Sequence, residues 1–361
     1  MLRSAGRRVA PVVTGWWWAP GSRLFLVGEG AAWSIDEDLA ALGRIAGKLG
    51  ARVADVRLLN GSREQAAFWG SHFSLLREPW KPPPHRLAAA YFHGRPGTPG
   101  MPEFDDAYGV LVDHHHELSR LQVSHSEIEQ LVLETGMDAD KVHRIPIGIE
   151  PAYFTPVSDE LRRTARRRFG IPESAFVVGS FQKDGVGWGD GDEPKLVKGP
   201  DVLVDVLERV HREIPELHVL LSGPARGYVR RRLAAAGIPD LYRPVSFHAD
   251  VGTLYHALDA YLVSSRQEGG PKAVLESMAT GVPLVTTRVG QAMDLVQHRT
   301  NAYMVEPGDV DGLAHWLLHL AGRPAELPSI RAEGIATAAA NSYEAQHPLW
   351  RAFLDGFVEL R

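Results

Sequence analysis

The sequence of 361 residues contains no cysteine. Disulfides, thiolate zinc sites, iron–sulfur clusters and a cysteine nucleophile are therefore excluded. Long apolar runs are also absent, since no stretch approaches the roughly 18 residues that a membrane-spanning helix needs. Charge of one sign is in small excess, because 39 Lys and Arg oppose 44 Asp and Glu, a net charge of −5. We therefore expect no nucleic-acid partner of the kind that a positive global field attracts.

The composition is typical of a soluble globular protein, with 44% hydrophobic and 23% charged residues. At about 150 residues per domain, the length predicts two domains. The first 22 residues are basic and then apolar, but Pro11, Gly15 and Pro20 interrupt the apolar run. This pattern favours an extended leader, whose tryptophans at 16–18 cover the first domain, over a signal peptide. We therefore expect a cytoplasmic protein.

Two successive α/β units follow, in which short apolar runs alternate with segments of helical spacing. This alternation predicts parallel sheets that are covered on both faces, an α/β fold. Strands are predicted within residues 23–30, 51–59, 85–92, 119–124 and 141–147, then within 175–181, 217–223, 241–247, 259–265, 282–287 and 301–306. Helices are predicted at 36–50, 200–214, 273–281 and 309–322.

The domain boundaries are predicted from prolines and composition. Pro151 and Pro156 bracket an extended segment that is typical of a linker. We therefore expect an N-terminal domain at 1–150, a C-terminal domain at 151–328, and an Ala-rich helical segment at 329–361. That last segment either caps the second domain or crosses back to the first.

The most informative segment, residues 264–296, contains a strand end, a turn with Gly269 and Gly270, and a helix that Pro271 can open at its first position. Unpaired amides at a helix start, together with the helix dipole, favour an anion there. Glu268 and Glu276 flank this start, and carboxylates accept hydrogen bonds from sugar hydroxyls. The structural alternative is an ion pair between Lys272 and Glu276, worth about 0.3–0.5 kcal/mol. A lysine in the first helical turn opposes the dipole, so this pair explains its position poorly.

EGGPKAVLESMATGVPLVTTRVG, residues 268–290, resembles the E-x7-E signature of retaining GT-B glycosyltransferases of family GT4 (glycosyl transferases group 1). KVHRIPIGIEPAYFTP, residues 141–156, resembles that family's interdomain segment. VVGSFQKDG followed by LVKGPDVLVDVL resembles its strand-then-Lys-Gly-helix phosphate site. The resemblance extends from about residue 120 to 310. It implies two Rossmann-like domains that face each other across a cleft, with a nucleotide-sugar donor on the second and the acceptor on the first.

The resemblance also implies roles for individual residues. Glu276 would accept hydrogen bonds from the ribose, and Glu268 would contact the transferred sugar. Lys198 would stabilise the charge that develops on the diphosphate. Donor-binding residues are expected to be Lys183, Lys198, Gly269, Gly270, Pro271, Lys272, Ala273 and Glu276, catalytic residues Glu268, His93 and Lys198, and acceptor-side residues Gly28, Gly30 and His93.

The sequence departs from the family pattern at three places. The family's phosphate-contacting arginine is absent from SFQKDG, so that Lys183 stands in for it or Gln182 weakens the site. Residues 185–194 form an unusually long glycine-rich connection, either a surface loop or a lid over the ligands. Pro271 replaces a glycine and donates no amide, so one phosphate contact is expected to be missing.

In the first domain, His93 follows a predicted strand at the edge of the sheet where ligands bind. A histidine at a strand end also commonly serves as a structural hydrogen-bonding group, and both interpretations stay open. Gly28 and Gly30 follow the first strand but do not complete a dinucleotide fingerprint.

Other polar clusters give no cofactor. His114–His116 are consecutive, so their side chains cannot converge on one ion. No D-x-D motif follows a first-domain strand, which predicts activity without metal and no cofactor. The basic run at 162–170 predicts a solvated helix face. The alternative is a patch for anionic lipid at the inner face of the membrane or for a phosphorylated acceptor.

The sequence as a whole predicts transfer of a sugar from a nucleotide-diphosphate donor to a hydroxyl acceptor (a glycan, lipid or natural product) with retention of configuration. A non-catalytic nucleotide-sugar-binding protein and a nucleotide-sugar epimerase of the same fold are the alternatives. The donor base, the donor sugar, the acceptor and the oligomeric state stay open.

Overall fold

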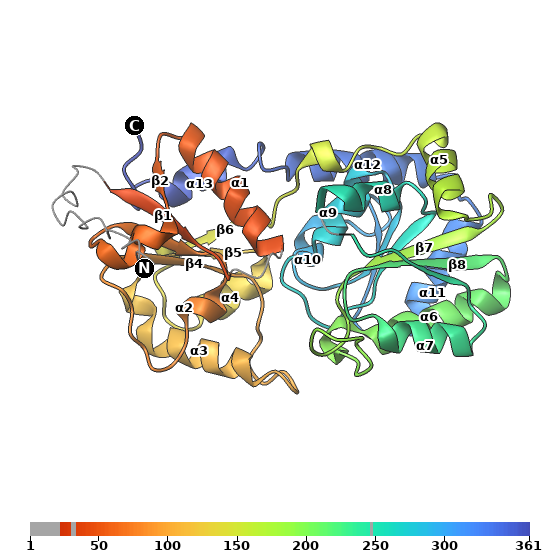
Figure 1. Ribbon diagram of the computed structural model, residues 1–361, viewed down its shortest axis with the longest axis horizontal. Coiled ribbons are helices and arrows are strands. Elements are labelled where there is room, and N and C mark those ends of the chain that lie inside the picture. Colours follow the sequence, from red (N-terminus) through yellow and green to blue (C-terminus); the bar gives the residue numbers. More distant parts are fainter. Residues whose placement is uncertain (1–21, 30–33, 246–247) are drawn as a thin grey trace, which may run out of the picture.

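Each half of the chain folds around one parallel sheet, because short runs of buried Ala, Val, Leu and Phe alternate with amphipathic helices (Figure 1). The computed structural model describes residues 22–29, 34–245 and 248–361. The first sheet has the order β2 (Arg52–Ala54), β1 (Arg23–Val27), β3 (Ala66–Trp69), β4 (Arg86–Tyr91), β5 (Leu118–Val123), β6 (Val142–Arg144). The second has the order β12 (Tyr303–Val305), β11 (Leu284–Thr287), β10 (Ala260–Val263), β7 (Phe176–Phe181), β8 (Leu217–Ser222), β9 (Asp240–Tyr242).

The strand orders define where each sheet can bind a ligand. Renumbered from β7, the second sheet has the order 6-5-4-1-2-3, which is the Rossmann arrangement. The first sheet begins 2-1-3-4-5, the flavodoxin-like arrangement of the doubly wound fold. Ligands bind at the carboxyl edge where the strand order reverses. These switch points lie between β1 and β3 and between β7 and β10.

Both sheets are buried on both faces, as the near-continuous apolar strands require. Successive residues of one strand enter different cores: Leu24 and Phe25 do so in β1, and Val177 and Val178 do so in β7. In the first domain α1 (Ser34–Lys48) and α13 (His347–Leu354) cover one face, and α2 (His72–Leu75), α3 (Pro102–His114) and α4 (Ser126–Leu133) the other. In the second domain, one face of the sheet is covered by α5 (Asp159–Phe169), α8 (Val251–Tyr255), α9 (Lys272–Ala279) and α12 (Leu327–Ala340). The other face is covered by α6 (Pro200–Glu213), α7 (Gly227–Ala235) and α11 (Val310–Ala321). The short helix α10 (Ala292–Leu295) follows β11.

The C-terminal segment links the two domains. Helix α12 packs against α9, whereas α13 packs against α1. Between them, Ser342 forms a bridge with Ile149 of the interdomain segment. On the first domain, the rings of Trp350 and Phe353 meet Phe68 edge-on at centroid distances of 5.9 and 5.6 Å. The last segment of the chain therefore crosses back to the N-terminal sheet, and the predicted boundary at 328 falls inside α12.

Three secondary-structure predictions were wrong in detail. Strand β3 was not predicted, although it lies between β1 and β4. Within 51–59 only β2 is a strand, because the Asp55 side chain accepts the Arg57 amide and starts a 3-10 helix, Val56–Gly61. The strand predicted within 241–247 ends at Tyr242.

The basic run at 162–170 is not simply a solvated face, which corrects the sequence prediction. Arg166 of α5 is fully buried, donates to the carbonyls of Ala257, Glu173 and Ala175, and pairs with Asp259 at 2.6 Å. This arginine therefore fastens α5 to the strand that begins after Asp259.

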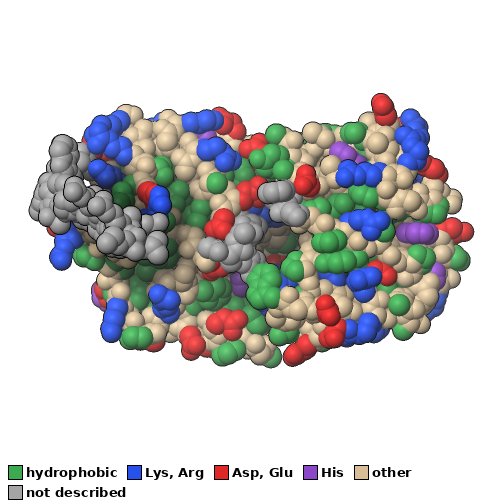
Figure 2. Space-filling view, viewed as in Figure 1, with side chains coloured by type: hydrophobic (Ala, Val, Ile, Leu, Met, Phe, Trp, Pro, Cys, Tyr) green, Lys and Arg blue, Asp and Glu red, His purple; other side chains and the backbone are tan. Residues whose placement is uncertain are grey.

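Charge of both signs is spread over the surface. On the face shown in Figure 2, acidic and basic side chains are interspersed over both domains. Among the described residues, no helix is long and apolar enough to cross a membrane. The predicted covering role of Trp16–Trp18 lies outside the described residues.

Candidate functional site

A cavity of about 370 Å³ lies between the two domains, at the carboxyl edges of both sheets. This volume falls in the usual range of small-molecule sites, roughly 300–1,000 Å³. The N-terminal domain contributes residues that follow β1, β3 and β4, and the C-terminal domain contributes the segments that follow β7 and β10. Both switch points therefore open into the same space.

The Lys-Gly segment before α6 is held against the end of β10. Lys198 ends a single 3-10 turn, and Gly199 follows with φ 60°. A Cβ on Gly199 would lie 2.1 Å from the carbonyl oxygen of Ser264, so only glycine allows this approach. Ser264 Oγ donates to the Gly199 carbonyl at 2.9 Å. The side-chain amide of Gln182 donates through Nε2 to the Lys198 carbonyl at 3.1 Å. These contacts fix the direction of the Lys198 side chain.

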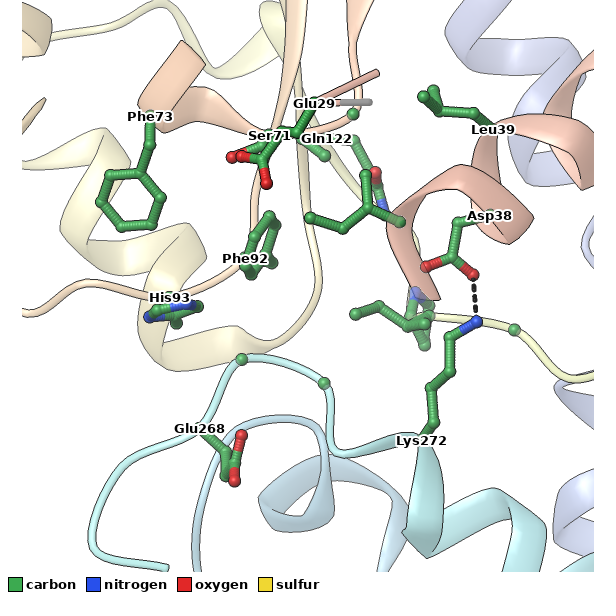
Figure 3. A pocket seen from close by; sticks show the side chains of 18 of the residues that line it. Glu29, Asp38, Leu39, Ser71, Phe73, Phe92, His93, Gln122, Glu268 and Lys272 are labelled. Carbon is green, nitrogen blue, oxygen red and sulfur yellow. Dashed lines mark ion pairs between the residues drawn. The ribbon is translucent and has the colours of Figure 1, made fainter. Parts of the chain in front are cut away.

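Lys198 and Glu268 meet at the floor of the cavity. The Lys198 Nζ lies 2.5 Å from Glu268 Oε2, and Ser265 Oγ donates to Glu268 Oε1 at 2.8 Å. Both carboxylate oxygens are therefore held by partners from different segments. Glu268 lies on the loop opposite His93, and both line the cavity (Figure 3).

The glycine turn after Glu268 lies close to the N-terminal domain. A Cβ on Gly269 would lie 2.4 Å from the carbonyl oxygen of Phe92, and one on Gly270 would lie 2.4 Å from Ile147 Cδ1. Helix α9 begins at Lys272, with Pro271 as its cap in an extended conformation at ψ 104°. The expectation that Pro271 occupies the first helical position is therefore wrong by one residue. Ala273 packs on the core below α9.

Glu276 is a buried residue of α9 and does not line the cavity. It is 5% exposed and accepts a hydrogen bond from the Tyr255 hydroxyl at 2.9 Å. Burial, followed by the Glu276 charge, raises the pKa of Tyr255 well above its ordinary value, so the phenol remains a donor. Glu276 does not belong to the cavity lining, and its assignment to the ribose stays a prediction.

A second lysine joins Lys198 that the sequence analysis did not single out. Lys195 lines the cavity, and burial, followed by the charges of Lys198 and Lys183, lowers its pKa. The spacing Lys195–Lys198 was the available signal, because residues i and i+3 eclipse in a 3-10 turn. Lys183, the expected phosphate ligand, lies outside the lining, with its Nζ 4.0 Å from the centre of the Trp188 ring. Burial lowers its pKa as well.

The long loop that carries Trp188 is anchored on α7. Asp190 and Gly191 accept the amides of Gly227 and Tyr228 at 2.6 and 2.9 Å. A Cβ on Gly191 would meet the Ala225 carbonyl at 2.1 Å. A lid motion of residues 185–194 would have to break these contacts.

Beside this loop a buried arginine supports the strand end after β7. Arg226 donates to the Gln182 carbonyl at 2.6 Å and pairs with Asp184 at 3.3 Å. Both side chains are almost completely buried.

His93 forms part of an aromatic cluster on the wall of the N-terminal domain. Its ring lies 4.8 Å from that of Phe92 and 5.1 Å from that of Phe104, measured between centroids. Burial, followed by the charge of Lys198, lowers the pKa of His93 well below 6.5. The imidazole is therefore neutral at physiological pH and can accept or donate one hydrogen bond.

Lys272 points away from α9 to the N-terminal domain. Its Nζ lies 2.9 Å from Asp38 of α1 (Figure 3). Glu37 of the same helix lies 3.4 Å from that Nζ. Tyr343 donates to the same Asp38 at 2.6 Å. These contacts favour pairing of Lys272 with α1 over the alternative that Lys272 serves mainly to pair with Glu276 on its own helix. They join α9, α1 and the crossing segment.

Gly28 follows β1 outside the cavity lining, and a Cβ there would lie 2.6 Å from Asp36 Oδ1. Its neighbour Glu29 does line the cavity. Gly30 lies outside the described residues. Within the described ranges, no group of three or more His, Cys, Asp or Glu side chains could hold a metal ion. His114 instead bonds Glu117 at 2.8 Å and stacks on Trp80.

The sequence is similar to a known protein family and to curated proteins over part of its length. Residues 191–323 match the family model described as glycosyl transferases group 1. The D-inositol 3-phosphate glycosyltransferase of Xylanimonas cellulosilytica is 32% identical over 51% of this chain and 43% of its own length. The mannosylfructose-phosphate synthase of Agrobacterium fabrum is 26% identical over 52% of this chain and 41% of its own length. The chain thus spans less than half the length of these curated relatives.

Solved structures extend the likeness over both domains. Anabaena HepE in complex with UDP-glucose matches with a TM-score of 0.72 and 17% identity, covering 93% of this chain and 100% of that chain. Sucrose-phosphate synthase from Thermosynechococcus elongatus matches with a TM-score of 0.60 and 19% identity, covering 80% and 71%. The predicted GT-B fold is therefore confirmed.

Proposed function

We propose that the chain is a retaining glycosyltransferase of family GT4 that moves a sugar from a nucleotide-diphosphate donor to a hydroxyl acceptor. The observation that carries the proposal is the pair of lysines, Lys195 and Lys198, beside Glu268 and a glycine turn in an interdomain cavity. Two cations suit a diphosphate, and a carboxylate suits sugar hydroxyls. The neutral His93 faces the same space from the acceptor side.

In the proposed reaction the acceptor oxygen forms a bond to the anomeric carbon while the bond from that carbon to the diphosphate oxygen breaks. The acceptor proton passes to the leaving diphosphate on the same face of the sugar, so the configuration is retained. Lys198 and Lys195 stabilise the negative charge that develops on the diphosphate. Closure of the two domains excludes water and protects the sugar from hydrolysis.

UDP-glucose is the first donor to test, because a protein of the same fold has been solved with it. Calorimetry with UDP-glucose and GDP-mannose identifies the base, and proton NMR of the product reports the anomeric configuration. An α-linked product from an α-linked donor supports retention, and a β-linked product contradicts it. Binding without transfer or hydrolysis across an acceptor panel favours the non-catalytic binding protein. Conversion of the donor sugar to its epimer favours the epimerase.

Substitution of the two signature glutamates separates binding from catalysis. Glu276→Gln should weaken UDP-glucose binding at least tenfold, because the ribose loses a charged acceptor. Glu268→Gln should reduce kcat at least a hundredfold with a smaller change in donor affinity. Glu333→Gln on the exposed surface of α12 is the matched control and should change neither. Normal donor binding and transfer in both signature variants would show that the site is misassigned.

We further propose that transfer needs no metal ion or cofactor. Activity should be unchanged in excess EDTA, since Lys195 and Lys198 supply the positive charge at the diphosphate. A loss of activity in EDTA that Mg²⁺ or Mn²⁺ restores would contradict this. Location in the cytoplasm, with contact at the inner face of the membrane, stays a prediction and is tested by cell fractionation.

A further inference from the structure

The wall of the cavity contributed by the N-terminal domain is largely apolar. Leu39, Phe73, Phe92, Met101, Phe104 and Trp350 line it, the last from the helix that crosses back. Figure 3 shows Phe73 and Phe92 on this wall, across the cavity from Glu268. A phosphate group would have to give up its hydration at such a wall, and apolar side chains offer it no hydrogen bond in return. An apolar or aromatic body, by contrast, binds such a wall favourably, because its transfer out of water lowers the free energy.

The charge on this wall has one sign. Among the described residues, the acids that the N-terminal domain contributes to the lining are Glu29, Asp38 and Glu103, and it contributes neither lysine nor arginine. Asp38 is matched by Lys272. Among the described residues, the cations of the opposite wall are Lys195 and Lys198, which the proposed function assigns to the diphosphate, and Lys272, which pairs with α1. An anionic acceptor on the N-terminal side would therefore meet negative charge.

One polar group on the apolar wall is buried without a partner. Ser71 is 1% exposed and lines the cavity just after β3, and its Oγ has no hydrogen-bond partner among the residues that the structure describes. A buried hydroxyl without a partner is unfavourable, so it marks a position where a bound molecule would supply one. Its hydrogen-bonding capacity suits a hydroxyl or carbonyl of a bound molecule.

From the apolar wall, the acidic residues and the orphan Ser71 hydroxyl, we infer that the acceptor is an uncharged hydroxyl-bearing molecule with an aromatic or aliphatic body, not a phosphorylated sugar or polyol. This inference rests on the proposed glycosyl transfer. It assigns Ser71 as an acceptor-positioning residue and Glu103 as a residue that disfavours anions.

Three probes test the inference: 2-naphthol, its 6-sulfonate and D-myo-inositol 3-phosphate. The first two share rings and hydroxyl and differ in charge. Direct binding is measured by fluorescence or calorimetry without donor, and kcat/KM is measured with UDP-glucose by mass spectrometry. We expect 2-naphthol to bind at least tenfold more tightly than either anion and to be the preferred acceptor. Equal or tighter binding of the sulfonate or the inositol phosphate would overturn the inference.

Variants locate the probe in the cavity. Ser71→Ala should weaken 2-naphthol binding severalfold, and Glu103→Lys should strengthen sulfonate binding at least fivefold. Asp106→Lys makes the same charge change on α3 outside the lining and should leave sulfonate binding unchanged. Equal effects of Glu103→Lys and Asp106→Lys would show that the sulfonate responds only to overall charge, and would overturn the assigned role of Glu103.

The donor-free measurement separates this inference from the proposed function. If 2-naphthol binds as expected but no nucleotide sugar binds, glycosyl transfer is wrong while the class of molecule in the cavity stands. If UDP-glucose binds and its glucosyl group is transferred preferentially to the inositol phosphate, with release of UDP, the proposed function stands and the acceptor inference is wrong.

Discussion

At the scale of single residues, two histidines beside the cavity are kept neutral by their surroundings. His72 is fully buried, stacks on Tyr91 at a centroid distance of 3.9 Å, and lies 3.2 Å from the Ala90 carbonyl through Nδ1. Burial lowers the pKa of His72 to about 3, and burial, followed by the charge of Lys198, lowers the pKa of His93 well below 6.5. Nδ1 of His72 therefore carries the proton that it donates to Ala90.

Because both histidine pKa values are depressed on folding, stability should fall as the pH falls below about 6.5. Between that value and the folded pKa, the unfolded chain binds protons that the native chain does not. His72 alone should contribute roughly 2 kcal/mol to the difference in unfolding free energy between pH 6.5 and 5. His72→Asn does not titrate and should reduce that difference, as measured by urea unfolding at both pH values. His116→Asn, at an exposed position, is the control. An identical pH dependence in His72→Asn and the parent chain would disprove this assignment.

At the scale of elements, the turn between β10 and α9 depends on glycine, because a Cβ at Gly269 would overlap neighbouring backbone. A Cβ on Gly269 would meet the Phe92 carbonyl, and one on Gly290 would lie 2.1 Å from the Gly269 carbonyl. The Gln291 amide donates to that same carbonyl at 2.9 Å. The turn is therefore packed on both sides by backbone, which cannot move aside as a flexible side chain can.

Gly269→Ala should displace this turn and reduce UDP-glucose affinity at least tenfold, with a loss of about 1–3 kcal/mol in stability. The matched control is Gly109→Ala in the middle of α3, where a new Cβ meets nothing within 4 Å. That control should stabilise the protein by about 0.5–1 kcal/mol, because alanine favours a helix over glycine. Calorimetry and urea unfolding measure both variants. Unchanged donor affinity in Gly269→Ala would remove the turn from the site.

The elements also show how far the sequence could predict this fold. The short apolar strands and the Lys-Gly and Glu-Gly-Gly segments are each contiguous in the sequence, so the local pattern was sufficient to single out Lys198 and Glu268, which line the cavity. Strand β3 was missed; its residues become a strand through their pairing with β1 and β4, which only the folded chain supplies. Arg166 was expected at the surface, since only tertiary structure supplies the carbonyls that it bonds.

The apolar wall of the cavity could not be predicted for the same reason. Ser71, Met101 and Trp350 come from three distant parts of the chain and meet only after the last helix crosses back. None carries a motif. Their juxtaposition exists only in the folded chain, whereas the wall of the C-terminal domain is largely built from two contiguous segments.

At the scale of the whole molecule, the two domains are joined by the linker, by the crossing helix α13, and by the ion pairs of Lys272. Burial opposes the charge of Lys272, but the carboxylates of Asp38 and Glu37 prevail and raise its pKa. A raised lysine pKa contributes stability that is fully present below the ordinary value of 10.5. This contribution is lost only as the pH rises through the raised pKa. The contact between the domains therefore persists across physiological pH.

Lys272→Met should leave Asp38 and Glu37 facing α9 without their cation and cost about 1–3 kcal/mol. Lys48 offers a matched control, because it also joins α1 to the crossing segment, at 2.8 Å from Glu344, but both side chains are mostly exposed. Lys48→Met should cost less than about 1 kcal/mol. Adding Asp38→Asn to Lys272→Met should recover part of the loss, since one uncompensated carboxylate is removed. Urea unfolding measures the stabilities, and small-angle scattering should show a larger radius of gyration for Lys272→Met alone. If Lys272→Met and Lys48→Met cost the same and leave the radius unchanged, the buried pair does not hold the two domains together.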